Sequence, residues 1–102
     1  MNRKEVVAEF DQLLSALGPV RSKPMFGGHG AYVNEKFAAI YDDDRLFIKL
    51  KGVPDDVVDR LFGNREQPYE GAKNYAEADP TSFENAEWVA ELRAELIRAK
   101  LI

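Results

Sequence analysis

Apolar residues near the N-terminus recur at intervals of three and four positions. Such spacing places them on one stripe of a helix. Gly18 and Pro19 follow the stripe and end it, because Gly favours the left-handed conformation after a helix and Pro cannot continue the hydrogen-bond ladder. The pattern predicts an amphipathic helix over residues 2–17, with its apolar side formed by Val6, Val7, Phe10, Leu13, Leu14 and Leu17.

The period changes to two between Val20 and Leu50, where aromatic and β-branched residues become common. This alternation predicts an antiparallel three-stranded meander. Two-residue turns at residues 34–35 and 43–44 would place Tyr32 opposite Phe37, His29 opposite Ile40, and Ile40 opposite Phe47.

These registers divide the meander into two faces. One face is apolar enough to pack against helices and form the core; its expected members are Tyr32, Phe37, Ala39, Tyr41, Leu46, Ile48 and Leu50. The other face is mixed rather than fully charged, and we expect it to hold His29, Ala31, Val33, Lys36, Ala38, Ile40, Arg45, Phe47 and Lys49.

The second half of the chain predicts two more helices. Pro54 and two aspartates start a short helix that Gly63 ends. Short strands are expected near residues 67–69 and 74–76, and Thr81 with Glu84 has the spacing of a capping box before a long helix that contains Trp88 and Leu92. The 102 residues therefore predict one α+β domain over 1–102, with the helices on one face of the sheet.

Charge and composition narrow the function. The chain has 14 Lys and Arg against 18 Asp and Glu, a net charge of −4 that disfavours direct nucleic-acid binding. It has no cysteine and no apolar stretch long enough for a signal peptide or a membrane span. We expect a cytoplasmic protein without a membrane partner.

No motif has the specificity of a catalytic or metal signature. The glycines of residues 27–30 lack the Lys and Ser/Thr of a phosphate loop and predict a structural bend. His29 is the only histidine, and the aspartates at 42–44 have no closing ligand. We therefore expect no cofactor, no metal and no catalytic residue; an enzyme that uses His29 with a carboxylate is an alternative.

Two surfaces are candidates for binding. The first is a homodimer or partner face made by His29, Ile40, Phe47 and Lys49, since an apolar row is costly to leave in water. The second is a groove for a small molecule or peptide, the alternative function, with expected members Met25, Phe26, Gly27, Gly28, Tyr69 and Tyr75.

The segment from Met25 to Val33, with residues 37–40 and 46–49, resembles the TfoX N-terminal domain family, and the likeness continues through Pro68-Tyr69 to Trp88. The family is bacterial and is named after a regulator of DNA-uptake competence; its fold is similar to small α+β dimers of the secretion-chaperone type. The resemblance implies a non-catalytic regulatory or adaptor domain that self-associates and contacts proteins, such as the transcription machinery. We expect a single-domain member of the family, because full-length competence regulators continue into a second, helical domain whereas this sequence stops at Ile102. The family often has Asp-Gly where this chain has Asn34-Glu35.

Overall fold

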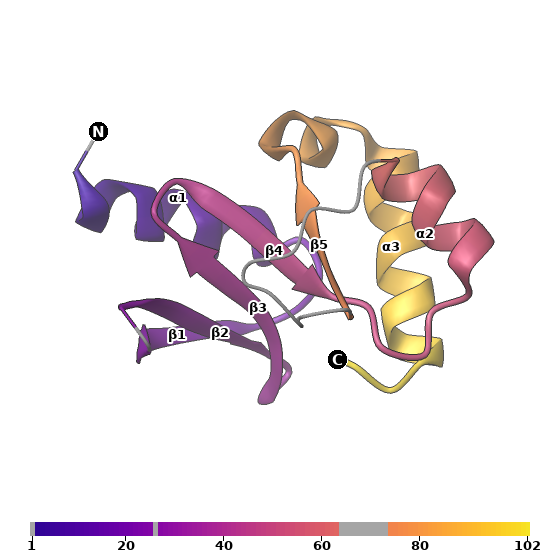
Figure 1. Ribbon diagram of the computed structural model, residues 1–102, viewed down its shortest axis with the longest axis horizontal. Helices are drawn as coiled ribbons and strands as arrows, with labels where there is room; N and C mark the ends of the chain where they lie inside the picture. Colours follow the sequence, from indigo (N-terminus) through magenta and orange to yellow (C-terminus); the bar gives the residue numbers. More distant parts are fainter. Residues whose placement is uncertain (1, 26, 64–73) are drawn as a thin grey trace.

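The computed structural model describes residues 2–25, 27–63 and 74–102. It confirms the α+β class, with a five-stranded antiparallel sheet in the order β1-β2-β3-β4-β5 (Figure 1). In chain order the elements are α1 (Arg3–Leu14), β1 (Val20–Met25), β2 (Gly28–Val33), β3 (Lys36–Asp42), β4 (Arg45–Lys49), α2 (Asp55–Phe62), β5 (Tyr75–Ala78), the 3-10 helix η1 (Pro80–Glu84) and α3 (Ala86–Arg98). The meander expected to have three strands has four, β1 to β4, because the chain reverses between Met25 and Gly28 and β1 pairs with β2. The expected strand near 74–76 is β5, and the one at 67–69 lies outside the described residues.

Helix α1 follows the predicted stripe. The Asn2 side chain accepts a hydrogen bond from the Glu5 backbone N–H at 2.9 Å and so caps the first turn. Val6, Phe10 and Leu14 are buried against the sheet.

The capping box expected at Thr81 and Glu84 is a wrong prediction. These residues lie in η1, whose cap is Asp79, and α3 starts later, where the Asn85 side chain accepts from the Glu87 and Trp88 backbone N–H groups. Asn85 is itself a preferred capping residue. The single expected helix start is therefore replaced by two caps, Asp79 for η1 and Asn85 for α3.

Both predicted turns are present, and the first has two left-handed residues, Asn34 at φ 53° and Glu35 at φ 65°. Tyr32 lies opposite Phe37, as expected. The register then shifts, because β3 has one extra residue, Ala38, between the partners of Ala31 and Tyr32. Such a bulge moves every later pair by one position.

The shift corrects three predictions. His29 lies opposite Tyr41 instead of Ile40. Tyr32 and Phe37 are half-buried on the face away from the core, and the core positions belong to Ala31 and Val33, which are fully buried. The bulge exchanges the two faces of β2 relative to β3, a change that strict alternation cannot predict.

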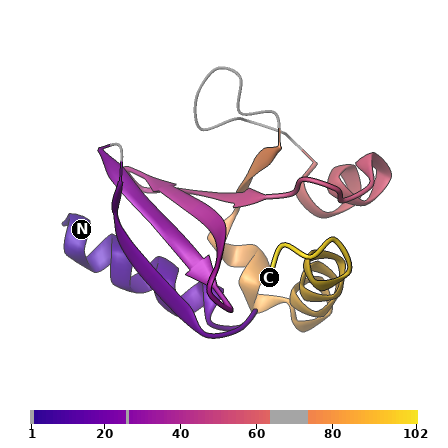
Figure 2. The same cartoon turned by 90° about the horizontal axis from the view of Figure 1, so that it is seen from below.

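The core lies between the sheet and the helices, with α1 and α3 on one side of the sheet (Figure 2). The Phe10 and Tyr41 rings meet edge to face at 5.2 Å, and Tyr41 donates a hydrogen bond to Asp11 at 2.7 Å. Burial raises the pKa of the Tyr41 phenol, and the bond to Asp11 raises it further. Of the other core residues predicted from the sequence, Leu14, Ile48, Leu50 and Leu92 are buried, and Trp88 is partly buried.

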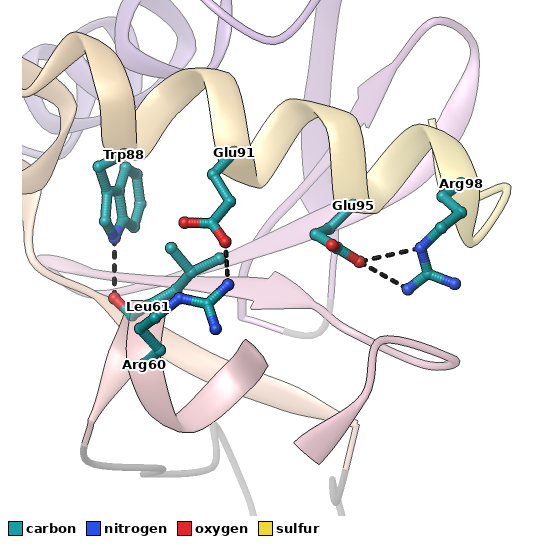
Figure 3. A network of polar contacts seen from close by, with 6 residues as sticks. All are labelled: Arg60, Leu61, Trp88, Glu91, Glu95 and Arg98. Atoms are coloured by element: carbon teal, nitrogen blue, oxygen red, sulfur yellow. Dashed lines mark hydrogen bonds and ion pairs between the residues drawn. The ribbon is translucent and has the colours of Figure 1, made fainter. Parts of the chain in front are cut away.

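Helices α2 and α3 lie side by side at the end of the sheet (Figures 1 and 2). The Trp88 indole N–H donates to the Leu61 carbonyl at 2.8 Å, and Arg60 forms an ion pair with Glu91 (Figure 3). Leu61 is the last buried residue of α2, so this hydrogen bond fixes the end of α2 against the first turn of α3.

Candidate protein-interaction surface

The face of β1, β2 and β3 that turns away from the core carries a group of cationic, aromatic and aliphatic side chains, which we call the Tyr32 patch. Cross-strand partners share a face of a sheet. Arg21 pairs with Tyr32, Tyr32 with Phe37, and Gly30 with both Lys23 and Ile40. The patch comprises Arg21, Lys23, Met25, Tyr32, Phe37 and Ile40.

Tyr32 is the centre of the patch. Its ring meets Phe37 edge to face at 5.5 Å, and the Arg21 guanidinium and the Lys23 ammonium lie 4.5 Å and 5.5 Å from its centroid. A cation over an aromatic face adds about 0.5–1 kcal/mol at an exposed site. These contacts hold the half-buried ring in place.

Because Gly30 has no side chain, the side chains of Met25 and Phe37 pack directly on the β2 backbone. A Cβ at Gly30 would lie 2.7 Å from Phe37 Cε1 and 2.9 Å from Met25 Sδ, so these two side chains cover the glycine. Gly28 has a different role, because a Cβ there would lie 2.3 Å from the Tyr41 carbonyl oxygen. The glycine segment is therefore needed for close approach, in line with the structural bend that the sequence predicts.

The charge of the patch is positive although the whole chain is acidic. Arg21 donates two hydrogen bonds to Glu35 Oε2, at 3.1 and 3.2 Å, but both side chains are mostly exposed and such a pair contributes only about 0–1 kcal/mol. Lys23 has no carboxylate partner among the residues that the structure describes. The patch thus offers a cation and two aromatic rings to a partner.

The predicted dimer face does not form one surface. The His29 ring stacks on Tyr41 at 6.5 Å on the core side of the sheet, whereas Ile40 and Phe47 lie on the opposite side. Phe47 has no exposed surface, and the Arg45 guanidinium lies 5.0 Å from its ring. Lys49 is half-buried and pairs with Tyr75. Only Ile40 is shared with the Tyr32 patch.

The predicted groove is also not assembled. Met25, Gly27 and Gly28 lie at the β1–β2 hairpin on one edge of the sheet, and Tyr75 lies in β5 on the other edge. Four strand spacings of about 4.8 Å put them roughly 19 Å apart. Phe26 and Tyr69 lie outside the described residues.

Arg21 and Lys23 are site residues that the sequence did not reveal. Their signal was the alternation Arg21, Lys23, Met25, which places all three on one face of a strand. Their neighbour Ile40 lies on the same face only because of the bulge, which the sequence does not reveal. Within the described ranges, no helix is long and apolar enough to cross a membrane, and no group of three or more His, Asp or Glu side chains is placed to hold a metal ion.

The comparisons with known proteins bear on the whole fold. The sequence profile of the TfoX N-terminal domain family matches residues 12–99, from the second half of α1 to the residue after α3. No curated protein matches the chain. Because the matched segment includes every strand and most of the core, the resemblance seen in the sequence is confirmed: the chain belongs to the TfoX N-terminal domain family.

Proposed function

We propose that this chain is a non-catalytic regulatory or adaptor domain that works by contact with proteins, through the Tyr32 patch. Family membership supports the regulatory class. The observation that carries the proposal is the composition of the patch, in which exposed cations lie over the half-buried Tyr32 ring, since aromatic residues and Arg are enriched at the centres of protein interfaces.

The edge of the sheet next to the patch favours contact through the face. β1 is an edge strand, and it contains Lys23 and Pro24, residue types that oppose pairing with a further strand. Figure 2 shows α1 and α3 on the other side of the sheet, with no described helix over this side of β1–β3. A partner that packs on this face does not have to pair with the β1 edge, and no described helix blocks it.

Self-association is part of the proposal. In a two-fold contact the same patch meets itself, so like charges must be offset. Glu35 lies beside Arg21 at the end of the hairpin and is highly exposed, so Glu35 of one copy can approach Arg21 and Lys23 of the other. Apolar contact between the Tyr32 and Phe37 rings of two copies would then supply most of the binding free energy.

The test is the molar mass in solution. Light scattering on wild type at high micromolar concentration is expected to give a dimer, and Tyr32→Glu is expected to give a folded monomer, because an unpaired carboxylate is costly to bury. Ala90→Glu, an exposed position in α3, serves as the matched control and should stay dimeric. A monomeric wild type, or a Tyr32→Glu protein that is still dimeric, removes self-association from this face.

The role that goes with the family is regulation of transcription and of DNA uptake in the bacterial cytoplasm, through contact with transcription proteins. Tagged wild type captured from its native cells is expected to retain transcription proteins that Tyr32→Glu loses and Ala90→Glu keeps. Equal capture of these proteins by Tyr32→Glu and Ala90→Glu would show that they do not bind through the Tyr32 patch.

A further inference from the structure

A pocket of about 400 Å³ opens beside β5, at the sheet edge opposite to the β1 edge where the Tyr32 patch lies. Its lining residues come from α2, β5, η1 and α3, and helices α2 and α3 are at the right of Figure 1. Its volume falls within the range of small-molecule sites, about 300–1,000 Å³. The pocket is lined by Leu61, Phe62, Glu77, Ala78, Asp79, Pro80, Ser82 and Trp88.

The aromatic wall of the pocket is held rigidly. Trp88 donates its indole N–H to the Leu61 carbonyl at 2.8 Å (Figure 3). The rings of Phe62 and Phe83 meet the indole edge to face, with centroids 5.7 Å and 5.1 Å away. Because the N–H group is already bonded, Trp88 offers a ligand only the π surface of its ring. A wall fixed in advance costs little ordering when a ligand binds.

Carboxylates face the same pocket from β5 and the turn after it. Glu77 accepts hydrogen bonds from Arg45 at 2.9 and 3.2 Å. Asp79 uses one oxygen, Oδ1, to accept from both the Thr81 backbone N–H and hydroxyl, and these bonds lower the pKa of Asp79. Within the described part of the chain, Oδ2 of Asp79 accepts no hydrogen bond from a protein group. One charged oxygen is therefore available at the pocket.

The surrounding segment strengthens the negative potential. Residues 77–91 contain five carboxylates (Glu77, Asp79, Glu84, Glu87 and Glu91) and no Lys or Arg. Arg45 pairs with Glu77 and Arg60 with Glu91, so Asp79 is the carboxylate of the described lining that has no cationic partner in an ion pair. The N-terminus of α3 contributes roughly +0.5, so the potential stays negative.

We propose that this pocket binds a small organic cation with an alkylammonium group, whose carbon atoms contact Trp88 and Phe62 and whose charge faces Asp79. An aromatic face combined with a nearby carboxylate favours a cation over a neutral molecule of the same shape, and it repels anions. The site is distinct from the Tyr32 patch and does not depend on the function proposed for that patch.

The chain has one tryptophan, so its intrinsic fluorescence reports on this pocket directly. Choline is expected to produce a saturable fluorescence change. The neutral isostere 3,3-dimethylbutan-1-ol should bind more weakly than choline by a factor of about ten or more, because it lacks the charge. A parallel titration with Nα-acetyl-lysine amide distinguishes a free quaternary amine from a lysine side chain as the preferred source of the ammonium group. Equal binding of choline and its isostere, or no saturable change with either cation, would overturn the proposal.

Asp79→Asn removes the charge but keeps an oxygen that can cap η1, so the fold should be preserved. Its choline affinity, measured by calorimetry, is expected to fall about tenfold. Asp43→Asn, an exposed carboxylate in the β3–β4 turn, is the matched control and should bind like wild type. Unchanged affinity in a folded Asp79→Asn protein refutes the role of Asp79. If that variant is unstable, the salt dependence of choline binding by wild type is measured instead. An affinity that does not change with salt concentration contradicts an electrostatic contribution to binding.

Discussion

Two phenylalanines on the same face of the sheet differ sharply in burial. Phe47 has no exposed surface, whereas Phe37 is half-buried beside Tyr32. Strict alternation predicts the reverse roles, with Phe37 in the core and Phe47 at an exposed interface. Because both have the same side chain, their substitution energies measure the environment alone.

Phe47→Ala is therefore expected to lower the free energy of unfolding by about 3–5 kcal/mol, the usual loss when a buried aromatic ring is removed. Phe37→Ala should lower it by about 1 kcal/mol, since only part of its surface returns to water. Urea denaturation of both variants checks this order. Equal losses, or a larger loss for Phe37→Ala, would contradict the burial seen here.

Tyr41 makes stability depend on pH. Its phenol is buried and donates to Asp11, and its pKa is raised in the folded protein, while the unfolded chain ionises near pH 10. The unfolded state thus loses this proton first. The stabilisation is complete below about pH 10 and is lost as the pH rises further, by up to about 1.4 kcal/mol per pH unit.

Tyr41→Phe is expected to cost about 1–3 kcal/mol at neutral pH and to flatten the decline above about pH 10. Ser22→Ala, which removes the other hydrogen bond to the Asp11 carboxylate, is the control and should keep the alkaline decline of wild type. Parallel unfolding curves at neutral and alkaline pH give the comparison. The same alkaline slope in Tyr41→Phe and wild type would show that another group is responsible.

At the scale of elements, alternation and turn chemistry could predict the helices, the β2–β3 and β3–β4 hairpins and the pairing close to their turns, but not the separation of β1 from β2. The Asn34-Glu35 and Asp43-Asp44 turns are where the sequence places them. The bulge at Ala38 could not be predicted, because alanine has no preference for either face and the extra residue has no local signal. One unpredicted residue was enough to misplace Tyr32, Phe37 and His29, and with them the candidate site.

The Asn34-Glu35 turn contains a strained residue, and a substitution can measure that strain. Glu35 has φ 65°, a left-handed conformation that costs a residue with a side chain about 1–2 kcal/mol. Glu35→Gly should relieve this cost, while Glu35→Gln removes only the exposed ion pair with Arg21. Thermal unfolding is expected to show Glu35→Gly more stable than Glu35→Gln by about 1 kcal/mol. A Gln variant at least as stable as the Gly variant would rule out strain at this turn.

The whole molecule separates its charges. The Tyr32 patch, at the β1 edge, is positive, and the pocket lined by Trp88 and Asp79, beside β5, is negative. Composition alone gives only the net charge of −4. The separation depends on the strand order, which places β1 and β5 at opposite edges of the sheet.

His29 contributes to packing, because its ring stacks on Tyr41. His29→Ala is expected to remain folded and to lose no more than about 1 kcal/mol. Calorimetry with zinc or magnesium should show no specific uptake by wild type, since no second imidazole or cysteine is present in the sequence. Stoichiometric, tight zinc binding that His29→Ala abolishes would refute the packing role.

The strand order has a kinetic consequence. Strands β1 to β4 pair with their sequence neighbours through short turns, whereas β5 joins β4 only after the chain has passed through α2. Closing a short loop costs less entropy than closing a long one, so the four-stranded meander should form before β5 docks. Ala39→Gly in β3 is then expected mainly to slow refolding, and Ala76→Gly in β5 mainly to speed unfolding. Stopped-flow refolding and unfolding rates of the two variants measure this order, and the opposite pattern would mean that the β4–β5 pair forms early and guides the meander.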